Sequence, residues 1–503
     1  MKRERGEFFS PLFSYIFKKN KDINFMKLYN GLQKNVDEIK KTLNSDDIIY
    51  FNFNIDSINA VAIYAESLSD KTLLGKQVIE PLKNLSDVSS VDEIIKSITL
   101  PEAEKIEDFS NCALKIISGD AIILINGLNT AVSVSTKKPA ARAVSEPPTA
   151  SILKGPREGF VENSQTNMSL IRQRLKTPDL KYEKITVGKQ SQTTVGLVYI
   201  SSIANKKVVD ELRSKIKAIN VDGIIDSSYV IKSISSKKTS MFKQVGSTEK
   251  PDIFSAKLLE GRVGIIVDGS PIALTVPFVF IEDFQSSEDY YINTYRANFS
   301  RILRISAVII SILLPAFFVS AQLFHLQFIP LAFLLTIVGS IKGIPLSPSV
   351  EMFVTLLIFE ILNEASIRMP RYVGIAMSVV GALVLGETAV NAGMVSTPTI
   401  MIIALSGICF YAVPDLNETL SVLRLMFLTI AGFMGGYGIV LLACSLITYL
   451  CAFDSFGTPY MSPYAPMNLG DMQDGFIMNF FAEQEKRPSF LKTKNKVRKK
   501  IYE

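Results

Sequence analysis

The apolar residues of this chain are distributed very unevenly, and this constrains its fold more than any other feature. Almost every long apolar run lies between residues 302 and 452 of a 503-residue sequence. The run at residues 305–324 has no charge and is long enough to cross a bilayer. We therefore expect an α/β soluble amino-terminal region of two subdomains, followed by an α-helical multi-pass membrane domain.

An internal repeat supports the division of the soluble region into two subdomains. Residues 119–135 and 261–277 match at an offset of 142 without a gap, so that Gly119 matches Gly261 and Gly127 matches Gly269. Each segment is typical of two short strands joined by a turn, with Asn-Gly in the first segment and Asp-Gly in the second. Both dipeptides are strong hairpin signals. Chance similarity of two ordinary hairpins is the alternative explanation.

Changes in composition along the chain predict six segments. They are a flexible basic and aromatic amino terminus (1–23), a first α/β subdomain (24–135), a linker rich in Pro, Ala and Ser (136–156), a second α/β subdomain (157–298), a membrane domain (299–455) and a basic tail (456–503).

The charges that flank the apolar runs predict the topology. No secretory signal is recognisable in the amino terminus, and eight of the fifteen residues 486–500 are Lys or Arg, so both ends are expected in the cytoplasm. The number of crossings must then be even. We prefer four spans plus two partial insertions over six spans. The expected spans are 305–324, 350–368, 373–395 and 425–452, and the expected partial insertions are 328–341 and 400–413.

Charged residues within the apolar runs are candidates for an ion path, because a carboxylate at the centre of a bilayer costs about 2.5–3.5 kcal/mol. Glu360, Glu364 and Arg368 follow an i, i+4, i+8 pattern, and Glu387 lies one helical turn before Asn391. We expect Glu360, Glu364, Glu387 and Asn391 to line a hydrated path. A simple pairing of Glu364 with Arg368 near a membrane surface is equally consistent with the pattern.

Small residues in the last apolar run predict close helix packing. Gly432, Gly435 and Gly436 form overlapping small-x-x-x-small pairs with their neighbours, which allow two helix backbones to approach.

Several kinds of chemistry are not supported by the composition. His325 is the one histidine, and the four cysteines form no C-x-x-C pair, so we expect no metal site. The net charge of +6 is small for nucleic-acid binding, and no phosphate loop or nucleophile elbow occurs. We expect a non-enzymatic protein without a cofactor.

Five sequence strings resemble one family. They are GPREGFVENSQTNMSLIRQRL (155–175), GRVGIIVDGSPIALTVPFVF (261–280), QSSEDYY (285–291), PLSPSVEMF (345–353) and FGTPYMSPYAP (456–466). In order and spacing they resemble the A subunits of bacterial spore germination receptors, the GerA family, over residues 119–466. The first string is the most specific.

The resemblance implies a location, partners and a function. It implies a multi-pass protein of the endospore inner membrane that works with a transporter-like B subunit and a lipoprotein C subunit and responds to small nutrients. The A subunits would assemble, in contact with membrane lipid, into a homo-oligomer that forms a gated cation channel. The alternative is a membrane-anchored scaffold, with ion conduction elsewhere.

The resemblance also identifies candidate subunit or domain contacts. Arg157 and Glu158 occupy signature positions of the family, and Arg172 and Arg174 match its paired arginines. Because an Arg side chain can bind a carboxylate through two hydrogen bonds, we expect these arginines to hold acids such as Glu158 or Glu162.

Overall fold

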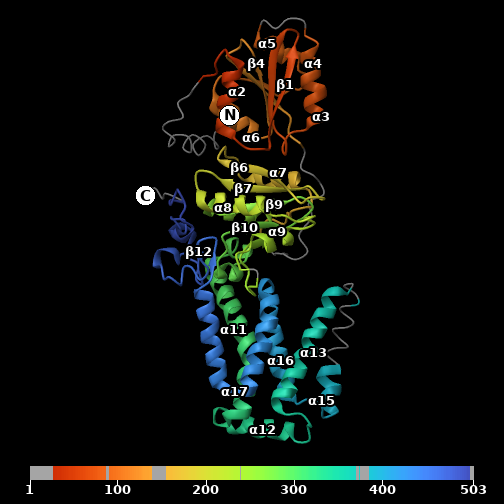
Figure 1. Ribbon diagram of the computed structural model, residues 1–503, viewed down its shortest axis with the longest axis vertical. Helices are drawn as coiled ribbons and strands as arrows, with labels where there is room; N and C mark the ends of the chain where they lie inside the picture. Colours follow the sequence, from red (N-terminus) through yellow and green to blue (C-terminus); the bar gives the residue numbers. More distant parts are fainter. Residues whose placement is uncertain are drawn as a thin grey trace, which may run out of the picture.

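The computed structural model describes residues 27–85, 90–138, 154–237, 239–369, 373 and 384–498. The predicted amino terminus (1–23) and most of the predicted linker lie outside these residues, as do residues 374–383 of one expected span. Three tiers follow one another along the long axis (Figure 1): a first sheet, a second sheet, and a bundle of helices.

The first tier is a five-stranded antiparallel sheet with strand order β1-β2-β4-β5-β3. Its strands are β1 (Ile48–Ile55), β2 (Ile58–Ala65), β3 (Ala103–Ile106), β4 (Asp120–Ile125) and β5 (Ala131–Ser135). Its helices are α2 (Leu32–Leu43), α3 (Lys71–Leu74), α4 (Glu80–Lys83), α5 (Val91–Ser97) and α6 (Phe109–Ile117).

Helices cover both faces of this sheet because both sets of alternating strand residues are apolar. In β2, Val61 and Ile63 pack with α2 and α6, whereas Ala60 and Ala62 pack with α3, α4 and α5. Asp108 starts α6 by accepting a hydrogen bond from the backbone nitrogen of Asn111 at 2.8 Å. The first sheet therefore has its own two-sided core.

The second tier has the equivalent strand order, β6-β7-β9-β10-β8. Its strands are β6 (Leu180–Val187), β7 (Thr193–Ile200), β8 (Gly246–Thr248), β9 (Val263–Val267) and β10 (Ala273–Val276). Its helices are α7 (Ser164–Arg174) and α10 (Pro251–Glu260) on one face, and α8 (Lys206–Lys217) and α9 (Ser227–Ile234) on the other.

The two predicted hairpins are confirmed, with the same register. Ile123 pairs with Val132 between β4 and β5, and Ile265 pairs with Leu274 between β9 and β10, so both partners are displaced by 142 positions. Gly127 and Gly269 occupy the two turns with φ of 89° and 86°, a conformation that glycine adopts without strain. The repeat is thus structural as well as sequential.

The third tier is helical. Its main helices are α11 (Thr294–Phe324), α12 (Leu331–Ile341), α13 (Pro348–Arg368), α16 (Thr397–Phe410) and α17 (Asn417–Cys451). Figure 1 shows α11, α13, α16 and α17 running along the long axis, with α12 across the end farthest from the sheets.

Within the described residues, two helices are long and apolar enough to cross a membrane, at Thr294–Phe324 and Pro414–Cys451. The expected partial insertions correspond to α12 and α16, and α16 packs against α11 and α13. The expected span at 373–395 is described only in part, by the short helices η5 (Val384–Thr388) and α15 (Ala389–Asn391).

The chain after α17 returns to the second sheet. The Arg487 Nε donates to the carbonyl oxygen of Leu259 at 2.8 Å, and Lys494 Nζ donates to that of Ser201 at 2.9 Å. Two basic residues of the predicted tail thus bind backbone carbonyl groups of the second tier.

Candidate functional site: charged contacts between the tiers and within the helices

A buried ion pair joins the two sheets. Arg172, on α7, donates from Nε and Nη2 to the Oδ2 and Oδ1 atoms of Asp47 at 3.0 and 2.9 Å. The two side chains are 1% and 3% exposed. Arg172 Nη2 also donates to Ser45 Oγ at 3.2 Å. Among the predicted contact residues Arg157, Glu158, Glu162, Arg172 and Arg174, Arg172 forms an ion pair that spans the two tiers, and its partner is neither Glu158 nor Glu162.

Two lysines of β6 extend the same junction. Lys181 Nζ donates to the carbonyl oxygens of Thr42 and Leu43, both at 2.9 Å, at the carboxyl end of α2. Burial lowers the pKa of Lys181. Lys184 Nζ binds Glu66 at 2.8 Å. Burial raises the pKa of Glu66, but the hydrogen bonds and positive charges of Lys184 and Lys71 together lower it below its usual value.

The other signature residues lie at the surface. Arg174 forms an ion pair with Glu158, whose side chain is half exposed. Arg157 and Glu162 are exposed, and the carbonyl oxygen of Glu162 accepts a hydrogen bond from Gly269 N at 2.8 Å. This backbone contact connects the signature segment to the turn of the second hairpin.

The candidate ion-path residue Glu360 is paired within the bundle. Arg424, on α17, is completely buried, and its Nη1 lies 3.1 Å from Glu360 Oε1 on α13. The Arg424 guanidinium lies 5.3 and 5.1 Å from the ring centroids of Phe359 and Phe410. Ser421 Oγ donates to the other Glu360 oxygen at 3.1 Å. Arg424 therefore neutralises one of the carboxylates that the sequence assigned to a path.

The remaining ion-path candidates are exposed. Glu364 pairs with Arg368 one turn later on α13, with Nε to Oε1 at 2.8 Å, and both side chains are more than half exposed. Glu387 in η5 and Asn391 in α15 are exposed as well. In a single chain, the described contacts do not bring these residues together.

A second acid within the helices was missed from the sequence. Glu351, in the first turn of α13, is 1% exposed and accepts hydrogen bonds from the backbone nitrogen and the hydroxyl of Ser396, both at 2.7 Å. Ser396 precedes α16, so this contact joins the amino ends of two helices, where a negative charge is favoured. The available signal was an acid in the first turn of a helix that starts at Pro348-Ser349.

The predicted packing glycines of α17 face α11 and α13. Gly435 has φ of 60°, and a Cβ at this position would lie 2.8 Å from Phe324 Cδ2. A Cβ at Gly432 would lie 3.2 Å from Ser349, and one at Gly436 would lie 3.6 Å from Ser320. A side chain would be least tolerated at Gly435, where the backbone of α17 leaves the helical conformation and the helix is kinked.

An arginine cluster joins the bundle to the second tier. Arg301, near the start of α11, is buried and binds Asp289 at 2.9 Å and Asp474 at 2.8 Å. Arg304 also pairs with Asp289. Asp289 belongs to η3 (Ser287–Tyr290) and Asp474 to the segment after α17, so three separate parts of the chain meet here.

The described residues contain no group of three or more His, Cys, Asp or Glu side chains that could hold a metal ion. The charged groups reported above instead form ion pairs between tiers and between helices.

Comparison with known proteins places the chain in a family. Residues 36–490 match the sequence model of a protein family, GerA, described as the Bacillus/Clostridium GerA spore germination protein. The chain is 36% identical to spore germination protein KA of Bacillus subtilis, over 93% of this chain and 88% of that protein. It is 33% identical to spore germination protein GerLA of Bacillus cereus, over 86% and 89%.

A solved structure is also similar. The N-terminal domain of the A subunit of the Bacillus megaterium spore germinant receptor GerK3 is 30% identical, with a TM-score of 0.41, and covers 51% of this chain and 99% of that chain. Because the family model spans most of the sequence, the chain belongs to the GerA family of spore germination proteins.

Proposed function

We propose that the chain is the A subunit of a nutrient-responsive germinant receptor of the endospore inner membrane. Its partners are a transporter-like B subunit, a lipoprotein C subunit and further copies of itself. In this proposal the helical tier crosses the membrane several times, both chain ends are cytoplasmic, and several copies enclose a gated path for cations. Family membership and the two long apolar helices support the location.

The observation that carries the channel proposal is the exposure of Glu387 and Asn391 among apolar helices, together with that of Glu364, whose charge is shared with Arg368. Exposed apolar side chains such as Leu357 and Ile361 lie on the same helix as Glu364. A carboxylate exposed at the centre of a bilayer costs about 2.5–3.5 kcal/mol, so it must face water or another protein surface. Copies arranged in a ring supply such a surface, and their acids favour cations.

The alternative is that the subunit is a membrane-anchored scaffold. The pairing of Glu360 with Arg424 favours it, because this pair removes one negative charge from the expected path and places a fixed positive charge inside the bundle. In that case ions cross elsewhere in the receptor, and the contacts between tiers are the functional feature.

Charge neutralisation of Glu387 separates the two functions. Spores that carry Glu387→Gln are compared with the unmodified protein by the rate of potassium release after nutrient addition, with receptor assembly checked by co-purification of the subunits. The matched control is Glu38→Gln, which changes a partly exposed acid on α2, far from the helical tier. A channel predicts a changed release rate with normal assembly, and an unchanged rate contradicts it.

A further inference from the structure

A cavity of about 350 Å³ lies where the second sheet, the helical bundle and the final segment meet. It is bordered by α10, by β8 and β10, by the turns η2 (Phe280–Phe284) and η3, and by residues that precede α17 or follow it. Ligand sites are common at such junctions, and this volume suits a small molecule.

The cavity is rich in acids, but half of them have local counter-ions. Glu282 pairs with Lys257 at 2.9 Å and with Arg262 at 2.6 Å. Glu260 pairs with Arg262 at 3.1 Å. Asp289 is held by the arginines at the start of α11, as described above. These three carboxylates contribute to the junction and need no ligand.

Of the other three acids, Asp283 and Asp415 share one cation, Lys243. Asp283 Oδ1 lies 3.7 Å from Lys243 Nζ, and Asp415 Oδ1 lies 3.4 Å from the same nitrogen. Asp252 accepts a hydrogen bond from the hydroxyl of Tyr291 at 2.8 Å. Within the described residues, Lys243 is the only ion-pair partner of these acids, so this part of the cavity has an excess of negative charge.

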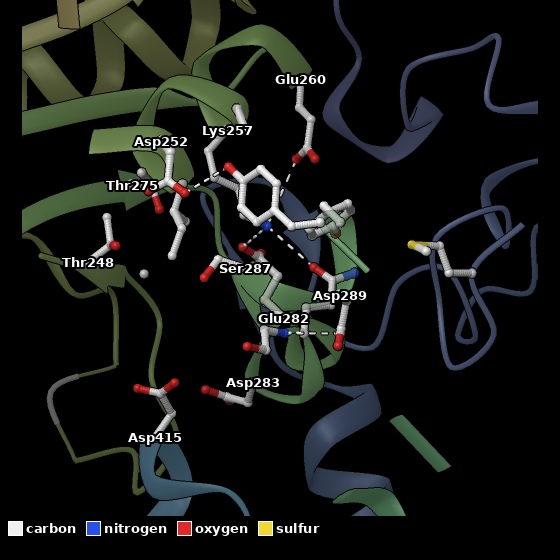
Figure 2. A pocket seen from close by; sticks show the side chains of 18 of the residues that line it. Thr248, Asp252, Lys257, Glu260, Thr275, Glu282, Asp283, Ser287, Asp289 and Asp415 are labelled. Atoms are coloured by element: carbon white, nitrogen blue, oxygen red, sulfur yellow. Dashed lines mark hydrogen bonds and ion pairs between the residues drawn. The ribbon is translucent and has the colours of Figure 1, made fainter. Parts of the chain in front are cut away.

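Asp283 is the most deeply buried of these three acids. It is 6% exposed, and its Oδ2 atom has no hydrogen-bond partner among the described residues. Figure 2 shows the carboxylate of Asp283 on the side of its residue that faces Asp415, and both acids line the cavity. Burial raises the pKa of Asp283 to about 8, against the effect of Lys243 and with that of Asp415. A buried polar atom without a partner is costly unless something binds it.

The walls favour an organic molecule over a bare ion. Apolar and aromatic side chains of Ile253, Phe278 and Tyr290 line the cavity together with the hydroxyl of Thr248. The described residues lack a cluster suited to a metal ion. A ligand with an ammonium group and a carbon skeleton would meet both the acids and the apolar surface.

We propose that this cavity binds a small organic molecule that carries a protonated amine, and that Asp283 and Asp415 hold its ammonium group. The proposal concerns binding alone and holds whether copies of the chain conduct ions or not. It assigns a ligand site to the junction between the soluble and helical tiers.

Three five-carbon probes that differ in charge test the proposal. The full chain in detergent is titrated calorimetrically at pH 9 with 1,5-diaminopentane, 1,5-pentanediol or glutarate. We expect binding of the diamine alone, with the dissociation constant raised at least tenfold by Asp283→Asn or Asp415→Asn. Asp56→Asn, in the turn between β1 and β2, is the matched control and should leave binding unchanged.

A second variant tests the site without removing any acid, so that weaker binding cannot be attributed to misfolding caused by the loss of a buried carboxylate. Ala256→Phe fills the cavity from α10, where the side chain of Ala256 is exposed, so it should abolish diamine binding without lowering the unfolding temperature. Equal binding of the diol or glutarate, diamine binding that the Asn variants do not weaken, or failure of the diamine to bind would each overturn the proposal. Displacement of the diamine by millimolar Ca²⁺ would also overturn it in favour of an inorganic cation.

Discussion

Arg172 and Asp47 are 125 positions apart in the sequence, yet two hydrogen bonds join their side chains inside the junction between the two sheets. Both side chains are almost completely buried. Removal of one member of a buried pair leaves the other charge without compensation, which is far more costly than the loss of an exposed pair.

We therefore expect Asp47→Asn to lower the free energy of unfolding by about 3–5 kcal/mol. Chemical denaturation of the full chain in detergent measures this change. Glu158→Gln is the control, because it removes the exposed partner of Arg174, and such pairs contribute about 0–1 kcal/mol. Equal effects of the two substitutions would show that the junction between the sheets is not held by this pair.

The helical tier also contains one buried and one exposed ion pair, Glu360 with Arg424 and Glu364 with Arg368, and we expect their loss to affect stability differently. Glu360→Gln leaves a buried guanidinium without its acid, so we expect a loss of about 3 kcal/mol and a lower amount of protein in the membrane. Glu364→Gln, which removes an exposed pair on the same helix, should change stability by less than about 1 kcal/mol. Unfolding temperature and membrane abundance are the measurements, and normal values for Glu360→Gln would contradict the role of the pair.

Gly435 should tolerate no side chain. Gly435→Ala introduces a Cβ at positive φ and 2.8 Å from Phe324, so we expect a loss of about 1–3 kcal/mol. Gly436→Ala, where the nearest atom would lie at an ordinary 3.6 Å, should be tolerated much better. Thermal unfolding in detergent compares the two variants, and the same unfolding temperature for both would refute the close approach.

The raised pKa of Asp283, about 8, predicts a pH dependence with a defined sign. The folded state binds a proton that the unfolded state has lost, so Asp283 lowers stability progressively as the pH rises from about 4 to about 8. Its charged neighbours are Lys243, Asp415 and Glu282, with Tyr460 also nearby. Asp283→Asn should remove this part of the pH profile of unfolding, and a profile unchanged by the substitution would refute the assignment.

The ionisation of Asp283 has the opposite effect on the proposed ligand, because it strengthens binding as the pH rises. A protonated amine binds the ionised carboxylate, so the affinity for 1,5-diaminopentane should increase between pH 6.5 and pH 9. Calorimetric titrations at these two pH values test this. Affinity that falls over the interval would contradict the role of Asp283.

The sequence predicted those features that are formed by residues close to one another along the chain. The two hairpins were predictable because an Asx-Gly or Asp-Gly turn and its flanking strands lie within 17 residues. The small residues for which we expect close packing in α17 likewise lie close together in the sequence.

Contacts between distant elements were not predictable in this way. Nothing in the spacing of Arg172 indicates Asp47, and nothing near Glu360 indicates Arg424, which is 64 positions away. Charge patterns predicted a basic tail and a path lined by acids, but not that Lys494 and Arg487 bind carbonyl groups of the second tier or that Glu360 pairs with Arg424. Pairing between tiers depends on the complete fold.

The return of the chain after α17 has a mechanical consequence. Two segments of the chain connect the helices to the soluble tiers: one leads into α11 and the other follows α17. An ion pair between Arg301 and Asp474 joins these two segments. A displacement of the bundle relative to the second sheet must therefore move both attachments at once. Such a two-point linkage transmits rotation, which a single flexible tether would absorb.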